Sequence, residues 1–122
     1  MATTTLTHDR VHIRFTSGER LWTRRERLSV PLTAVREASH APEPLRLPRG
    51  ARSGIAISGF LKIGTWGIFG GPRQLVSARR GQPGLHLLVD RAAAAGYDEI
   101  VLSDPAAPTL VESIRQIIRS HR

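Results

Sequence analysis

The chain has 122 residues, 40% of them hydrophobic, so it can fold as one domain with its own core and is not a disordered segment. It contains no cysteine, which excludes disulfides, thiolate metal sites and a cysteine nucleophile. Lys and Arg total 18 against 10 Asp and Glu, and the formal charge is +8. Because Lys62 is the only lysine, this charge indicates either an anion-binding surface or a genome that favours arginine.

The N-terminal segment, residues 1–10, is polar and rich in Thr, and we expect a flexible tail followed by a single domain over residues 11–122. The segment lacks the apolar stretch of a signal peptide. The most apolar region, residues 55–69, contains Lys62 and is interrupted by glycines, so it does not predict a transmembrane helix. The sequence therefore predicts a cytoplasmic protein with no transmembrane segment.

The first structured region shows strand patterns. Residues 11–15 alternate apolar and polar side chains with period two, which predicts a half-buried strand. Residues 17–18 are Ser-Gly and predict a turn, and residues 20–23 read as the return strand of a hairpin. Residues 28–30 predict another strand, whereas residues 35–40 fit either a strand or a short helical turn.

The middle of the chain is rich in proline and glycine. Residues 41–53 contain Pro42, Pro44 and Pro48 and predict a loop. Residues 54–70 contain five glycines. Since each would cost a helix about 1 kcal/mol relative to alanine, we expect strands with glycine bends or bulges in this segment.

The last third contains three strand patterns and one helical pattern. Residues 74–79, 85–90 and 98–103 predict strands, and the alanine-rich residues 91–96 between the last two predict a helical turn. Ser103-Asp104-Pro105 is typical of a helix start. An apolar helical face follows, formed by Leu110, Val111, Ile114, Ile117 and Ile118, and the basic residues Arg119 and Arg122 complement the negative end of the helix dipole.

These elements add up to about six to eight short strands and one C-terminal helix. A sheet of this size must close or fold over itself to hide its edges. We therefore expect a mainly β fold, a small barrel or roll with the C-terminal helix as a lid.

The order of these segments resembles the bacterial pleckstrin-homology-like domains from about Val11 to Ile118. The similar segments are Leu28–Val35, where a strand runs into a short turn, the glycine-punctuated region from Arg52 to Gly64, and Ser103-Asp104-Pro105 with Leu110. The resemblance implies a bent, antiparallel, seven-stranded barrel capped by the C-terminal helix. It also implies a ligand site at the loops near the open end of the barrel, where eukaryotic relatives bind phosphoinositides.

Patterns of catalytic and cofactor sites are missing from the sequence. Ser58 lacks the spacing of a nucleophile elbow, and the glycines between residues 64 and 71 lack the Gly-Lys-Ser/Thr ending of a phosphate loop. His8 and His12 would lie about 13 Å apart along a strand, too far to share one metal ion. Acidic residues near strand ends, namely Asp90, Asp98, Glu99 and Asp104, are typical of turns and caps. We expect no enzyme, no metal and no cofactor.

Two sets of residues are candidates for binding. The first is cationic and could hold an anion, because the arginine fork suits phosphate and carboxylate; it comprises Arg20, Arg24, Arg25, Arg27, Arg79 and Arg80. The second set is apolar and comprises Trp66, Ile68 and Phe69, which form either a protein-contact patch or part of the core.

The sequence therefore predicts a non-enzymatic binding or scaffolding module. In this hypothesis an exposed strand edge recognises another protein or a second copy of the chain. The alternative hypothesis is an electrostatic binder of nucleic acid or of an anionic membrane surface through arginine-rich loops.

Overall fold

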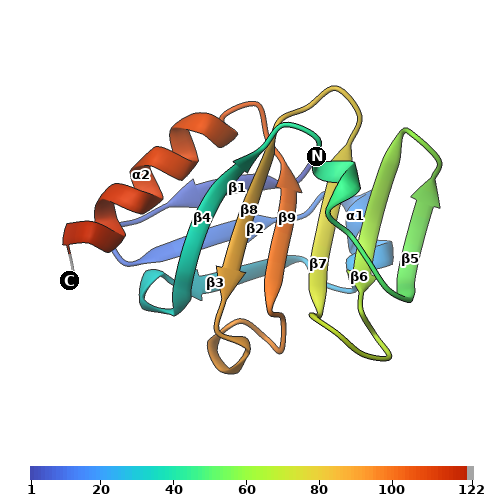
Figure 1. Cartoon of the computed structure of the whole chain (residues 1–122), viewed down its shortest axis with the longest axis horizontal. Helices are drawn as coiled ribbons and strands as arrows, with labels where there is room; N and C mark the ends of the chain where they lie inside the picture. The colour runs from blue at the N-terminus through green and yellow to red at the C-terminus, as the bar shows by residue number, and fades with distance from the viewer. Residues whose placement is uncertain (121–122) are drawn as a thin grey trace.

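The computed structural model describes residues 1–120 (Figure 1). Arg122, expected at the end of the last helix, lies outside the described residues. The strands are β1 (Thr3–Leu6), β2 (Arg10–Arg14), β3 (Arg27–Pro31), β4 (Val35–Ala41), β5 (Arg52–Ile57), β6 (Leu61–Trp66), β7 (Gln74–Arg79), β8 (Gly84–Val89) and β9 (Glu99–Ser103). The helices are α1 (Ser17–Thr23) and α2 (Ala107–Ser120), with short 3₁₀ turns η1 (Leu32–Ala34), η2 (Pro44–Arg46) and η3 (Arg91–Ala93).

The strands form two sheets. The smaller sheet has the order β1-β2-β3, and the larger has the order β4-β8-β9-β7-β6-β5. Neighbouring strands are antiparallel except β7 and β9, which are parallel. The fold is mainly β with a C-terminal helix, as the sequence predicts. Its nine strands lie in two separate sheets that do not close into one barrel, whereas the resemblance implies seven antiparallel strands in one barrel.

The main core lies between the two sheets, and Figure 1 shows the smaller sheet behind the larger one. Both sheets supply fully buried side chains to it, including Ile13 and Val30 from the smaller sheet and Leu75 and Ile100 from the larger. Helix α2 adds Ile114 to the same core. One continuous core therefore holds the two sheets together.

A second, smaller core lies on the opposite face of the larger sheet. Trp66, Val76 and Val101 point out of this face and are covered by Leu45 and Leu47. Since both leucines lie in or beside η2, the proline-rich segment is a lid over β6, β7 and β9 rather than a free loop.

Helix α1 corrects the hairpin strand expected over residues 20–23. Thr16 caps the helix by accepting from the backbone N–H of Glu19, and the Glu19 carboxylate accepts from the backbone N–H of Thr16. This reciprocal capping box fixes the first turn. Arg24 then ends the helix in the left-handed conformation, with φ of 58°.

The N-terminal segment also differs from the expected flexible tail. Residues 3–6 form β1, which pairs with β2 from Thr3 opposite Arg14 to Leu6 opposite Val11. Ala2 is buried in the core. Because Thr is β-branched and favours strands, a polar Thr run can serve as an edge strand without a hydrophobic pattern of its own.

The glycine-rich middle forms the β5–β6 hairpin, as expected, although β5 begins within the segment predicted as a loop. A Cβ atom on Gly54 would lie 2.2 Å from the carbonyl oxygen of Ile63, and one on Gly64 would lie 2.5 Å from that of Ser53. Only glycine fits this close approach.

Residues 35–41 are a strand, which settles the alternative left open by the sequence. The C-terminal helix begins at Ala107, two residues after the expected Pro105, and it buries Val111 and Ile114 as predicted. Neither α-helix within residues 1–120 has the length and apolar character needed to cross a membrane.

Candidate functional site

Strand β5 is an open edge of the larger sheet. Within residues 1–120 it pairs with β6 alone, because β5 is the last strand in the sheet order. It has six residues, contains no proline and carries one charge, Arg52, at its first position. A strand of this length without proline or central charges has few of the features that protect sheet edges from pairing.

The direction of the β5 backbone groups follows from its pairing with β6. The N–H of Gly67 donates to the carbonyl of Ala51 at 2.8 Å, so residues 51 and 67 form a hydrogen-bonded pair. In an antiparallel ladder, residues that face the partner alternate with residues that face away. The N–H and C=O groups of Arg52, Gly54 and Ala56 therefore point toward the open edge.

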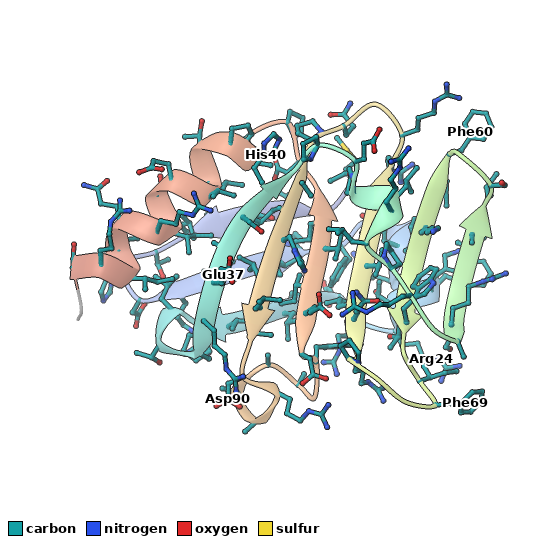
Figure 2. The ribbon with its side chains drawn as sticks, in the orientation of Figure 1. Arg24, Glu37, His40, Phe60, Phe69 and Asp90 are labelled. Carbon is teal, nitrogen blue, oxygen red and sulfur yellow. The ribbon has the colours of Figure 1, made fainter. Side chains whose placement is uncertain are left out.

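Exposed apolar side chains lie at one end of β5. Ile57, its last residue, is 48% exposed, and Phe60 in the following turn is 58% exposed. The guanidinium of Arg80 lies over the Phe60 ring, 5.6 Å from the centroid. Figure 2 shows Phe60 at the end of the hairpin where β5 joins β6. An extended segment on β5 would find both backbone partners and apolar contacts here.

Helix α1 supports the β5–β6 hairpin, since it contacts β5, β6 and β7. Its Glu19 is 1% exposed, and the hydroxyl of Ser77 on β7 donates to the carboxylate. Burial raises the pKa of Glu19, but the hydrogen bonds from Ser77 and the backbone of Thr16 outweigh it and hold the pKa below its usual value. The ionised carboxylate therefore ties α1 to the sheet.

The opposite edge, β4, is closed by α2. Figure 1 shows α2 beside β4, and the Nε of Arg115 donates to the carbonyl of Ala38 at 2.8 Å. The β4–β8 register also shifts between Val35 and Glu37, as in a β-bulge. A packed helix and a bulge are two of the devices that protect sheet edges.

The edges of the smaller sheet are less suited to pairing than β5. Strand β1 has only four residues, and β3 ends at Pro31, which has no N–H to donate. The open edge of β5 is therefore the strongest candidate for a binding site in the described chain.

The structure does not gather the six predicted anion-binding arginines into one site. Arg20, Arg24, Arg25 and Arg27 lie in α1, in the connection that follows it and at the start of β3. Arg79 and Arg80 lie at and just after the end of β7, whereas the guanidinium of Arg25 lies over the ring of Tyr97, just before β9. Because β7 and β9 are parallel, these two groups of arginines lie at opposite ends of the sheet.

A cavity of about 580 Å³ lies beside Arg79 and Arg80, between the η2 segment and the turns after β5 and β7. Two of its lining cations, Lys62 and Arg46, have internal partners. The Nζ of Lys62 donates to the carbonyl of Leu45 at 2.8 Å, and Arg46 pairs with Glu43 at 2.8 Å. The Lys62 hydrogen bond joins the η2 segment to β6, and the Arg46–Glu43 pair lies within the segment.

The predicted apolar contact patch is divided. Trp66 is 4% exposed in the smaller core, Ile68 is half-buried, and Phe69 is 89% exposed. Figure 2 shows Phe69 at the opposite end of the hairpin from Phe60. Only Phe69 of this set is thus a fully exposed surface residue, and the contact role of the set stays a prediction.

Two of the acidic residues near strand ends, Glu99 and Asp98, form ion pairs with arginines of neighbouring segments. Glu99 is buried and accepts a hydrogen bond from Arg49 at 3.0 Å, and its other oxygen lies 2.7 Å from Nε2 of His86. Asp98 forms a two-pronged pair with Arg91, which, with the backbone N–H of Arg73, holds the pKa of Asp98 below its usual value. Both carboxylates therefore have structural partners.

The sequence pattern predicts strands within residues 54–70 but does not single out Ile57 or Phe60. The pattern that could have marked them is an apolar residue on each side of the Ser-Gly turn at residues 58–59. That pattern still does not distinguish an edge strand from a central one.

Comparisons of the chain with models of known protein families, with curated proteins and with solved structures give no match.

Proposed function

We propose that this chain is a non-enzymatic binding module that acts by self-association, in which β5 of one copy pairs with β5 of a second copy. The observation that carries the proposal is the open β5 edge. It presents the backbone groups of Arg52, Gly54 and Ala56 beside the exposed Ile57. Strand addition at such an edge supplies main-chain hydrogen bonds in both directions.

An antiparallel pair of β5 strands has a suitable register with its two-fold axis at Gly54. In this register Gly54 faces Gly54 of the second copy, and Arg52 faces Ala56 of the second copy. All three residues direct their backbone groups outward, as a hydrogen-bonded antiparallel pair requires. The arrangement keeps the two Arg52 side chains apart, since like charges directly opposite each other destabilise a sheet.

Charge gives this mechanism a distinctive dependence on salt. Each copy carries a formal charge of +8, so two copies repel each other at low ionic strength. Because salt screens exposed charges, pairing of the backbone edges strengthens as salt rises. Binding of a polyanion has the opposite dependence.

The test is light-scattering mass across a wide range of protein concentration at low and moderate salt. We expect a monomer–dimer equilibrium that shifts toward dimer with concentration and salt. Ala56→Pro removes an outward-facing N–H and should shift the equilibrium to monomer, whereas Ala56→Ser retains the N–H and serves as the matched control. Circular dichroism would show that both variants are folded.

Two results would overturn the proposal. One is a monomeric wild type at every concentration and salt tested. The other is an Ala56→Pro variant that is folded and dimerises as the wild type does.

The assignment to the pleckstrin-homology-like family is also a proposal. Its support is coarse, namely the mainly β content and the C-terminal helix packed against the strands. The two separate sheets depart from the closed seven-stranded barrel of that family.

A further inference from the structure

The face of the smaller sheet that points away from the core is strongly cationic. Val11, Ile13, Leu28 and Val30 are buried in the core, so the alternate residues of β2 and β3 lie on the other face. We call this other face the polar face, and it includes Thr3, Thr5, Arg10, His12, Arg14, Arg27 and Ser29. By the strand alternation, no carboxylate of β1, β2 or β3 lies on it.

Two arginines on the polar face are direct neighbours. Arg14 and Arg27 lie opposite each other in the β2–β3 register, and both are exposed. Neither forms an ion pair with any residue of the described chain. Because like charges directly opposite each other destabilise a sheet, we expect a bound anion to relieve the repulsion between these two arginines.

The polar face also has hydrogen-bonding groups beside the charges. The Nε of Arg10 donates to the hydroxyl of Ser29 at 2.8 Å, and that hydroxyl lies 3.1 Å from Nδ1 of His12. A shallow hollow of about 460 Å³ is lined by residues that include Thr3, Thr5, His12, Arg14, Arg27 and Ser29. Arginine side chains with Ser and Thr hydroxyls are the groups that most often contact phosphate oxygens.

The spacing of the basic residues on β2 matches a particular anion. Arg10, His12 and Arg14 occupy alternate positions of one strand, so they are spaced by about 6.8 Å. This distance is comparable to the separation of successive phosphates along a nucleic-acid strand. The strands of the polar face carry no Phe, Tyr or Trp, the side chains that most often insert into a bilayer.

We propose that the polar face binds the phosphate backbone of a nucleic acid without sequence preference. Charge complementarity and phosphate-like spacing carry the proposal, and sequence preference is absent because contacts to phosphates alone do not read the bases. The site lies on a different sheet from β5, so it is independent of the proposed self-association.

The test is fluorescence anisotropy with labelled duplex DNA of two unrelated sequences over a range of salt. We expect equal affinity for both sequences. If Arg10, Arg14 and Arg27 each neutralise one phosphate, the plot of log affinity against log salt has a slope of about −2.7. The double variant Arg14→Gln, Arg27→Gln should bind at least tenfold more weakly at low salt, with a slope flatter by about two.

A charge-matched control distinguishes DNA binding at the polar face from general attraction between DNA and the positively charged protein. Arg36, in β4, and Arg73, just before β7, are exposed, and Arg36→Gln with Arg73→Gln removes the same two charges elsewhere. This control should lose less than threefold in affinity and keep the slope of the wild type. The single variant Arg14→Gln should flatten the slope by about one, which tests the site even if the double variant fails to fold.

Three outcomes would overturn the proposal. The first is no binding of duplex at low salt. The second is an equal loss of affinity in the control and the polar-face variants, which would show bulk charge attraction alone. The third is binding of phosphatidylserine vesicles without binding of duplex, which would assign the face to a membrane surface.

Discussion

The two edges of the larger sheet, β4 and β5, differ in how they are closed. At β4, α2 packs beside the strand and Arg115 bonds the carbonyl of Ala38. At β5, α1 supports the hairpin from the core side, and the backbone of Arg52, Gly54 and Ala56 stays open. One helix therefore closes an edge, whereas the other supports a strand and leaves its edge available.

Under the proposed self-association, this difference lets one small sheet be stable at one edge and pair at the other. An open edge on both sides would allow copies to add without limit, as in a filament. With β4 closed, pairing through β5 stops at two copies, because a two-fold pair uses up both open edges. This division of roles predicts different effects for substitutions in the two helices.

The largest effect is expected at Ile114, which is fully buried where α2 meets the core. Ile114→Ala removes three carbon atoms and leaves a cavity, so we expect a loss of about 3 kcal/mol in the free energy of unfolding. Urea unfolding measures this loss. Since the loss loosens α2 against β4, light scattering of the variant should also show species larger than dimers.

Ile118 is the matched control, because it lies on the same helix but is only partly buried. Ile118→Ala should cost about 1 kcal/mol or less, in keeping with its smaller buried area. Equal losses in the two variants would mean that α2 does not close β4 through the packing of Ile114.

The second effect concerns Glu19, which ties α1 to Ser77 on β7, two strands in from the open edge. Glu19→Gln removes a buried charged acceptor, and we expect a loss of about 2 kcal/mol in stability at neutral pH. Since the pKa of Glu19 is lowered in the folded state, its contribution is complete above its unfolded pKa of about 4.3 and disappears as pH falls through the folded value. Unfolding measured against pH should therefore show a flatter acid limb in the variant.

Glu26 provides the comparison for this prediction, because its side chain is 58% exposed. Glu26→Gln should change the free energy of unfolding by less than about 0.5 kcal/mol. If Glu19→Gln also changed stability by so little, α1 would not depend on the Glu19 carboxylate for its attachment to β7.

Much of the secondary structure could be predicted because it follows from local burial. Strands β2 and β8 and the apolar face of α2 show periods of two or 3.6 residues, since one face of each element is the more buried. Strands β7 and β9 are buried on both faces and were marked by short runs between turn signals. Helix α1 has only seven residues, and Leu21 with Thr23 imitates strand alternation. The Thr16–Glu19 capping box was the available signal for a helix start.

The candidate sites were harder to predict because they depend on pairing over long distances in the sequence. No local pattern shows that β5 is an edge, since this follows from the sheet order and from the parallel pairing of β7 with β9. Arg27 was predicted to bind anions, but its neighbour Arg14 was not. Their opposition becomes visible only when the β2–β3 register is known.

The smallest effect is expected at Arg115, whose hydrogen bond to Ala38 is the polar part of the β4 closure. Arg115→Ala should cost about 1 kcal/mol or less, because the side chain is exposed and water can replace the lost donor. Arg119→Ala, which removes an exposed partner of Glu112 on the same helix, is the control and should be close to neutral. Because one freed carbonyl does not make a strand ladder while α2 stays packed, the light-scattering mass of Arg115→Ala should match that of the wild type. Species larger than dimers in this variant would mean that the Arg115 hydrogen bond, rather than the packing of α2, keeps β4 closed.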